Sequence, residues 1–190
     1  MIVTENRLRE LSQWQRLEKS ATTETILHES VTSSFESYDI FLSHSSMDSD
    51  LILGVKSLLE KYGFSVYVDW VDDPQLIRSS VNSTSASIIR SRMQCSSMLV
   101  YAHTNNSAKS KWCPWELGFF DGSKGGNIFI FPISNRPESS FKGQEYLGLY
   151  PYIDEAPTKS GVEQLWINFG NSSVNLAEAK TKLYAPLYRS

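Results

Sequence analysis

The chain has 190 residues, of which 41% are hydrophobic and 12% aromatic, so it is long enough for one well-packed domain with additions at its ends. Its net charge of -3 argues against nucleic acid or an anionic membrane as a partner, because phosphate binding needs a basic patch. No apolar run approaches the ~20 residues of a membrane span, and the N-terminus lacks the apolar segment of a signal peptide, so we expect a cytoplasmic protein.

Residues 1–36 are expected to form an N-terminal helical extension. Hydrophobic side chains recur every three residues over roughly Glu5 to Lys19, which predicts an amphipathic helix. They are Leu8, Leu11, Trp14 and Leu17. Residues 26–31 suggest a second short helix. The extension can either pack on the domain or bind a partner, and packing is the safer assumption.

Strands and helices are expected to alternate from residue 37 onward. Short apolar runs predict five strands, at residues 38–42, 64–69, 98–101, 128–133 and 150–153. The second run alternates polar and apolar residues, which is typical of a half-exposed edge strand. Helical spacing predicts helices at residues 51–62, 84–96, 112–121, 162–169 and 174–183. Residues 70–77, with Asp72, Asp73 and Pro74, are expected to form a loop.

This alternation predicts an α/β domain with a parallel sheet and helices on both faces. With the second strand at the edge, the five strands take the order 2-1-3-4-5 of the flavodoxin-like class. We expect this domain to span residues 37–170, followed by a helix and tail at residues 171–190. In this order, ligands bind between strands one and three at their carboxyl ends. The loops that leave there are residues 43–48 and 103–111.

The densest aromatic run, residues 112–120, contains one carboxylate, Glu116. A helix from Trp112 would place Trp112 and Glu116 on one face, with Trp115 and Phe119 on an adjacent face suited to packing on the sheet. Taken alone, Glu116 is best explained as an acid near a helix N-terminus, where it complements the dipole. The predicted topology, however, opens this helix into the crevice, which makes a ligand-facing Glu116 an even alternative.

Other polar residues carry weaker signals. His44 and His103 fall in the two crevice loops but have no assignable catalytic partner, so they are expected to contact ligand or to be exposed. Arg90 and Arg92 are expected on the solvated side of a helix. The two cysteines fit reduced thiols, and no Cys/His spacing resembles a metal site, so no metal is expected.

Three separated motifs, in the right order, resemble the Toll/interleukin-1 receptor (TIR) domain family. The motifs are residues 38–43 (YDIFLS), residues 64–69 (FSVYVD), and Ser110, Trp112, Cys113, Glu116 and Leu117 in the aromatic helix. The resemblance covers most of the chain, and it is strongest to bacterial TIR proteins of antiphage defence such as the TIR subunits of Thoeris systems.

The resemblance implies that Glu116, four residues after a Trp, is catalytic, as in NAD-cleaving TIR proteins. It also implies a set of residues that bind or cover the substrate NAD+: Ser43, His44, Ser45, Trp70, Asp72 and Trp112. One departure concerns the loop after the second strand. Receptor-type TIR domains have a basic residue and a Pro-Gly pair there, whereas this chain has Asp72, Asp73, Pro74 and Gln75.

A lone carboxylate is chemically adequate for NAD+ cleavage, because nicotinamide leaves a pyridinium as a neutral amine and needs no proton. NAD+ is then a substrate, and no cofactor is required. The resemblance implies nicotinamide release and a cyclic ADP-ribose messenger that activates a companion effector, with possible self-association of TIR domains. The alternatives are a non-catalytic TIR adaptor and a nucleotide sensor that binds NAD+ without turnover.

Overall fold

The computed structural model describes residues 1–18, 37–73, 82–142 and 145–181. The predicted second helix at residues 26–31, the end of the predicted loop at residues 74–77 and the tail from residue 182 lie outside this part of the chain. No helix among the described residues is both long enough and apolar enough to cross a bilayer.

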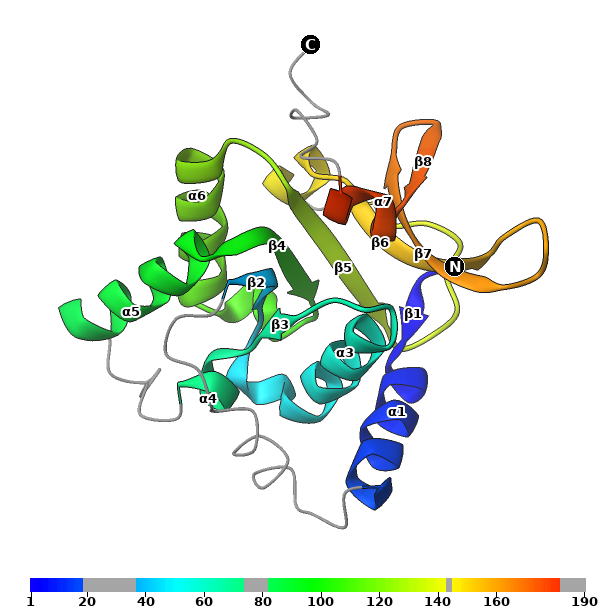
Figure 1. The fold of residues 1–190 in the computed structure, drawn as a ribbon, viewed down its shortest axis with the longest axis horizontal. Helices are drawn as coiled ribbons and strands as arrows, with labels where there is room; N and C mark the ends of the chain where they lie inside the picture. Colours follow the sequence, from blue (N-terminus) through cyan, green and yellow to red (C-terminus); the bar gives the residue numbers. More distant parts are fainter. Residues whose placement is uncertain (19–36, 74–81, 143–144, 182–190) are drawn as a thin grey trace.

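A mostly parallel sheet forms the centre of the molecule (Figure 1). Its path is β3-β2-β4-β5-β6-β7-β8, and β1 pairs with the end of β5. The strands are β1 (Val3–Thr4), β2 (Tyr38–Ser43), β3 (Val66–Tyr67), β4 (Ser96–His103), β5 (Ile128–Ser134), β6 (Tyr152–Pro157), β7 (Glu163–Phe169) and β8 (Ser172–Asn175). The α/β class is therefore confirmed. The predicted order holds within the parallel run β3-β2-β4-β5-β6, but the sheet has more strands than predicted.

The predicted helix at residues 162–169 is wrong, because this segment is strand β7, antiparallel to β6. Leu165 and Ile167 are buried while Trp166 and Asn168, which alternate with them, are half-buried, which is the period of two that a strand requires. The predicted helix at residues 174–183 is confirmed only in part. Residues 172–175 form β8, antiparallel to β7, and the helix α7 (Leu176–Thr181) begins only after it.

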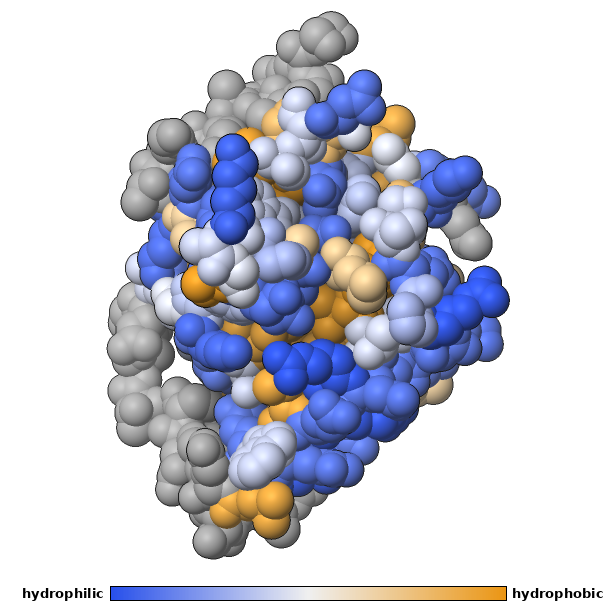
Figure 2. All heavy atoms as spheres, turned by 90° about the vertical axis from the view of Figure 1, so that its right-hand side faces the viewer, coloured by the Kyte–Doolittle hydropathy of each residue, from blue (hydrophilic) through white to orange (hydrophobic). Residues whose placement is uncertain are grey.

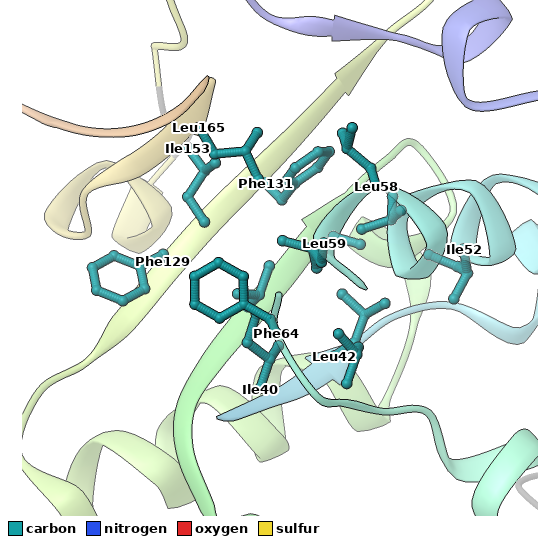
Figure 3. Packing of buried hydrophobic residues seen from close by; sticks show 14 of the residues in the cluster. Ile40, Leu42, Ile52, Leu58, Leu59, Phe64, Phe129, Phe131, Ile153 and Leu165 are labelled. Carbon is teal, nitrogen blue, oxygen red and sulfur yellow. The ribbon is translucent and has the colours of Figure 1, made fainter. Parts of the chain in front are cut away.

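Helices cover both faces of the sheet (Figure 1). Side chains of α3 (Ser49–Lys61) pack on one face, and side chains of α5 (Ser83–Gln94) and α6 (Trp112–Lys124) pack on the other. The predicted helices at residues 51–62, 84–96 and 112–121 are confirmed to within a few residues. Figure 3 shows Leu58 and Leu59 of α3 against Ile40 and Leu42 of β2 and Phe131 of β5.

The N-terminal segment joins the sheet and the core. Val3 and Thr4 pair with the end of β5, and α1 (Glu5–Glu18) packs along α3 through the fully buried Leu8. The predicted hydrophobic stripe is only half buried, because Trp14 is 66% and Leu17 is 73% exposed. On the face that carries α1, β1 and the β7–β8 hairpin, hydrophobic residues lie in a hollow among hydrophilic ones (Figure 2).

The second predicted strand is an edge strand, but it is not half-exposed. Val66, Tyr67 and Val68 are all buried, because α3 covers one face and Tyr38 and Phe41 contact the Tyr67 ring on the other. The segment after it is also more ordered than predicted. Residues 69–72 form a short helix, α4 (Asp69–Asp72), in place of the expected loop.

Candidate active site

Glu116 lies beside the carboxyl end of β2, at the edge of the sheet where the predicted topology puts the crevice. It projects from the second turn of α6 and is 0% exposed. The hydroxyl of Ser43, the last residue of β2, donates a hydrogen bond of 2.6 Å to Glu116 Oε2. Helix α6 begins here because the Ser110 hydroxyl accepts hydrogen bonds from the first backbone N–H groups, those of Trp112 and Cys113. The carboxylate and the carboxyl end of β2 are thus joined directly.

Trp112 lies on the buried side of α6 near Glu116, and its ring meets Trp115 edge to face at 5.4 Å. Trp115 and Phe119, the pair expected to pack on the sheet, stack on each other at 5.9 Å and lie half-buried against the cluster beneath α6. Cys113, Leu117 and Phe120 form the fully buried stripe of the helix.

His44 and Trp70 form a second contact beside this pair. His44 Nδ1 lies 2.8 Å from the Leu42 carbonyl, which can only accept, so Nδ1 carries the proton. The Trp70 indole N–H then donates to His44 Nε2 at 2.6 Å. The Trp70 bond requires an unprotonated Nε2 and hence the neutral imidazole, and Asp69 Oδ1 lies 3.5 Å from the same nitrogen. The bond ties α4, which was expected to cover the substrate, to the loop after β2.

Asp72 is the last residue of α4, and its side chain reaches back to the start of that helix. It accepts hydrogen bonds from the backbone N–H of Val68 at 2.7 Å and from the Tyr38 hydroxyl at 3.3 Å. Burial raises the pKa of Asp72 to about 6, and the neighbouring Asp73 carboxylate adds to that rise. These contacts make Asp72 an anchor for α4, and they do not bring it to the Ser43–Glu116 pair.

An ion pair that the sequence did not indicate lies under the same helix. Arg92 Nε and one terminal nitrogen donate to the two Asp73 oxygens at 2.8 and 3.0 Å, and the Tyr67 hydroxyl donates to Asp73 at 2.8 Å. The expectation that Arg92 is solvated was therefore wrong, whereas Arg90 is exposed as expected. The Arg92 pair joins residues 19 positions apart with no local pattern, so only the tertiary structure reveals it.

The loops after β2 and β4 are also fastened to each other. Ser45 caps the short 3-10 helix at residues 46–48 by accepting from the Met47 N–H. Asp48 accepts from the Thr104 hydroxyl and the Asn106 side-chain amide, both at 2.6 Å. The two crevice loops therefore form one rigid rim.

A cavity of about 650 Å³ opens along this rim, at the carboxyl ends of β4 and β5. Its walls come from residues 103–106, residues 132–135, 138 and 140–142, and from Ile2, Glu5, Arg9, Asp48 and Leu51. His103 lies in the wall, its ring 5.3 Å from Phe141, and burial lowers the pKa of His103. Glu116 is not part of this lining. Ser43, His44 and Glu116 are fully buried, so the carboxylate itself is closed off in this conformation.

Within the parts of the chain that the structure describes, no three His, Cys, Asp or Glu side chains gather as a metal ion would require. Cys95 is exposed and Cys113 is buried, and both are free thiols.

The fold and this edge define a flavodoxin-like α/β protein with a buried acid at the switch point, where such folds bind ligands. The sequence model of the TIR domain matches residues 40–166, more than half of the chain, so the chain belongs to the TIR-domain family. The resemblance read from the three motifs is thereby confirmed.

Two relatives are named for a reaction. The chain is 49% identical over 133 residues to a probable 3' cyclic ADP-D-ribose synthase, ThsB', of Bacillus cereus (strain MSX-D12). The matched region covers 69% of this chain and 68% of that protein. It is 30% identical over 102 residues to a putative cyclic ADP-D-ribose synthase, TIR2, of Cytobacillus dafuensis. That matched region covers 53% of this chain but only 27% of the relative.

Proposed function

We propose that this chain cleaves NAD+ at the nicotinamide glycosidic bond and closes the remaining ADP-ribose into a cyclic messenger. The observation that carries the proposal is the Glu116 carboxylate, fully buried at the switch point and hydrogen-bonded by Ser43 beside Trp112. Membership of the TIR family and the names of the two relatives, both cyclic ADP-D-ribose synthases, support it.

Glu116 is suited to stabilise positive charge on the nicotinamide ribose as the bond breaks. Nicotinamide leaves with the bonding electron pair as a neutral molecule, so no acid is needed at the leaving group. One well-placed electrostatic group in a dry site is typically worth ~3 kcal/mol of transition-state stabilisation. The Trp112 indole adds a cation–π attraction of about 1 kcal/mol to the pyridinium or the oxocarbenium ion.

The acceptor decides the product. An adenosine hydroxyl or adenine nitrogen that bonds to the anomeric carbon gives a cyclic product, and water gives linear ADP-ribose. The hydroxyl and water routes each release one proton, and the Glu116 carboxylate is the base placed to take it, whereas attack by an adenine ring nitrogen leaves the positive charge on the adenine. We propose that the cyclic product activates a companion effector in antiphage defence. The reaction requires no metal or cofactor, and the two free thiols suit the reducing cytoplasm.

NAD+ can reach Glu116 only after the site opens, because Ser43, His44 and Glu116 are shielded from solvent. The Trp70–His44 hydrogen bond is a contact that opening at α4 would break. We therefore propose that the closed conformation is the resting state, and that an infection-derived trigger or self-association of TIR domains exposes the carboxylate.

Nicotinamide release by the purified protein tests the proposal directly. Wild type is incubated with NAD+, alone and with extract from phage-infected cells, beside Glu116→Gln and the control Glu163→Gln, an exposed residue of β7. We expect release by wild type and Glu163→Gln and a loss of at least 100-fold in Glu116→Gln. Equal release by Glu116→Gln would remove the carboxylate from the mechanism.

The adaptor alternative is separated by phage protection in cells. If the chain only recruits partners, Glu116→Gln protects as well as wild type does. If it makes a messenger, Glu116→Gln loses protection, and mass spectrometry of small molecules from challenged cells finds the cyclic product in wild type alone.

A further inference from the structure

The 650 Å³ cavity lies at the carboxyl end of β4, the strand that pairs with β2 beside Ser43. Ser43, which binds Glu116, is paired with Tyr101 in the sheet register. His103 follows two residues later on the same face, about 7 Å further along the strand. The rings of Tyr101 and His103 are 6.4 Å apart. The cavity wall at His103 is therefore two residues along β4 from Tyr101, the residue that pairs with Ser43.

We propose that this cavity holds the adenosine half of NAD+ while the nicotinamide ribose lies at Glu116. The inference rests on the proposed function and names the part of the structure that binds the other half of the same substrate. Most of the cavity lies away from the Ser43–Glu116 pair, since α1 and the loop after β5 contribute to its lining.

The size and the chemistry of the lining suit a purine nucleoside. Ligand pockets of 300–1,000 Å³ are usual for molecules of drug size, and this cavity falls in that range. The half-buried Phe141 ring offers an apolar surface for a base to stack on. The exposed Asn105 lines the same cavity, and a carboxamide matches the donor and acceptor edge of adenine.

The charges along the lining leave room for a diphosphate at the rim. Asp48 is occupied by Thr104 and Asn106, Glu5 is paired with Arg9, and Glu138 accepts from Ser134 and faces Arg136 at 3.5 Å. Each of these acidic side chains thus already has a hydrogen-bond or ion-pair partner. Lys142 is exposed at the rim, where its ammonium group can meet the phosphates.

Holding the adenosine half in this place has a consequence for the product. Cyclisation needs an acceptor atom on the adenosine half beside the anomeric carbon, and fixing two reacting groups together raises their effective concentration by orders of magnitude. The cavity would therefore set the ratio of cyclic to linear product, while Glu116 sets the rate of bond cleavage.

Binding of ADP, measured by calorimetry, tests the proposal without any turnover. ADP carries the adenosine and diphosphate but lacks the nicotinamide riboside. The exposed Asn105 and Asn135 line the cavity from two different loops, so Asn105→Trp and Asn135→Trp each fill it. Ala108→Trp is the matched control, because Ala108 is exposed on the same loop as Asn105 but outside the lining.

We expect ADP to bind wild type, Glu116→Gln and Ala108→Trp alike, and to bind both Asn→Trp variants at least tenfold more weakly, with unchanged melting temperatures. No binding to wild type at millimolar ADP, or equal binding by both Asn→Trp variants, would overturn the inference. The proposed NAD+ cleavage and the proposed adenosine site can be disproved independently of each other. Undiminished NAD+ cleavage by Glu116→Gln sinks the proposed function, whereas the ADP pattern does not depend on Glu116.

Discussion

At the scale of single residues, the site is built from polar groups that satisfy one another. Glu116 receives the Ser43 hydroxyl, His44 is held between Leu42 and Trp70, and Asp72 is held by Val68. Buried polar groups are costly unless they are hydrogen-bonded, so each of these contacts also stabilises the closed conformation. The residues proposed for function therefore contribute to folding as well.

Asp72 links this network to pH. Its folded-state pKa of about 6 lies above the unfolded value near 3.8, so the folded protein holds a proton that the unfolded chain has released. The resulting stabilisation is complete below pH 3.8 and is lost as the pH rises through 6. Between pH 4.5 and 7.5 we expect wild type to lose up to about 2 kcal/mol more stability than Asp72→Asn.

Urea unfolding at the two pH values measures this difference, with Glu163→Gln as the carboxylate control. If the free energies of unfolding of wild type and Asp72→Asn change by the same amount with pH, the pKa of Asp72 in the folded protein is the ordinary one.

At the scale of elements, the contact between α1 and α3 depends on one glycine. A Cβ atom added at Gly54 of α3 would lie 2.2 Å from the Leu8 carbonyl oxygen of α1. Such a distance is impossible, and the obstacle is backbone, so the two helices would have to separate. The close approach also explains why Leu8 is fully buried while Trp14, further along α1, is exposed.

We therefore expect Gly54→Ala to lower the free energy of unfolding by about 1–3 kcal/mol through overpacking. Gly118→Ala is the matched control, because Gly118 is also inside a helix but a Cβ there meets nothing within 4 Å. The control should gain about 0.5–1 kcal/mol from helix propensity alone. Chemical denaturation measures both, and a neutral Gly54→Ala would show that α1 does not rest on α3 in solution.

At the scale of the whole molecule, two hydrophobic clusters share one sheet. Side chains of β2, β4 and β5 point alternately into the cluster beneath α3 and the cluster beneath α5 and α6. Neither cluster can lose its strands without exposing the other. The N-terminal strand and the antiparallel β7–β8 hairpin join the same sheet, so the described chain forms one cooperative unit.

This arrangement predicts a single unfolding transition. Far-UV circular dichroism and tryptophan fluorescence should give the same midpoint in urea, because helices and tryptophans lie on both faces of one sheet. Two separated midpoints would mean that the N-terminal segment or the β7–β8 hairpin unfolds on its own.

How much the sequence predicted depended on how local the signal was. The stripe in α3, the aromatic run of α6 and the apolar strands β2, β4 and β5 follow from periodicity, and their order placed Glu116 at the switch point. Strand β7 was misread as a helix because a short segment with four apolar residues is compatible with either period. Pairing with β6 makes this segment a strand, and no local sequence pattern indicates that pairing.

By itself, the sequence determined the α/β class, the parallel run of strands and the family, because alternation of period and short motifs are carried by neighbouring residues. Only the tertiary structure decided which side chains meet: Glu116 with Ser43, Trp70 with His44, Arg92 with Asp73, and α1 with the cavity edge. These contacts join residues far apart in the chain, and their geometry depends on how helices and loops settle on a finished sheet.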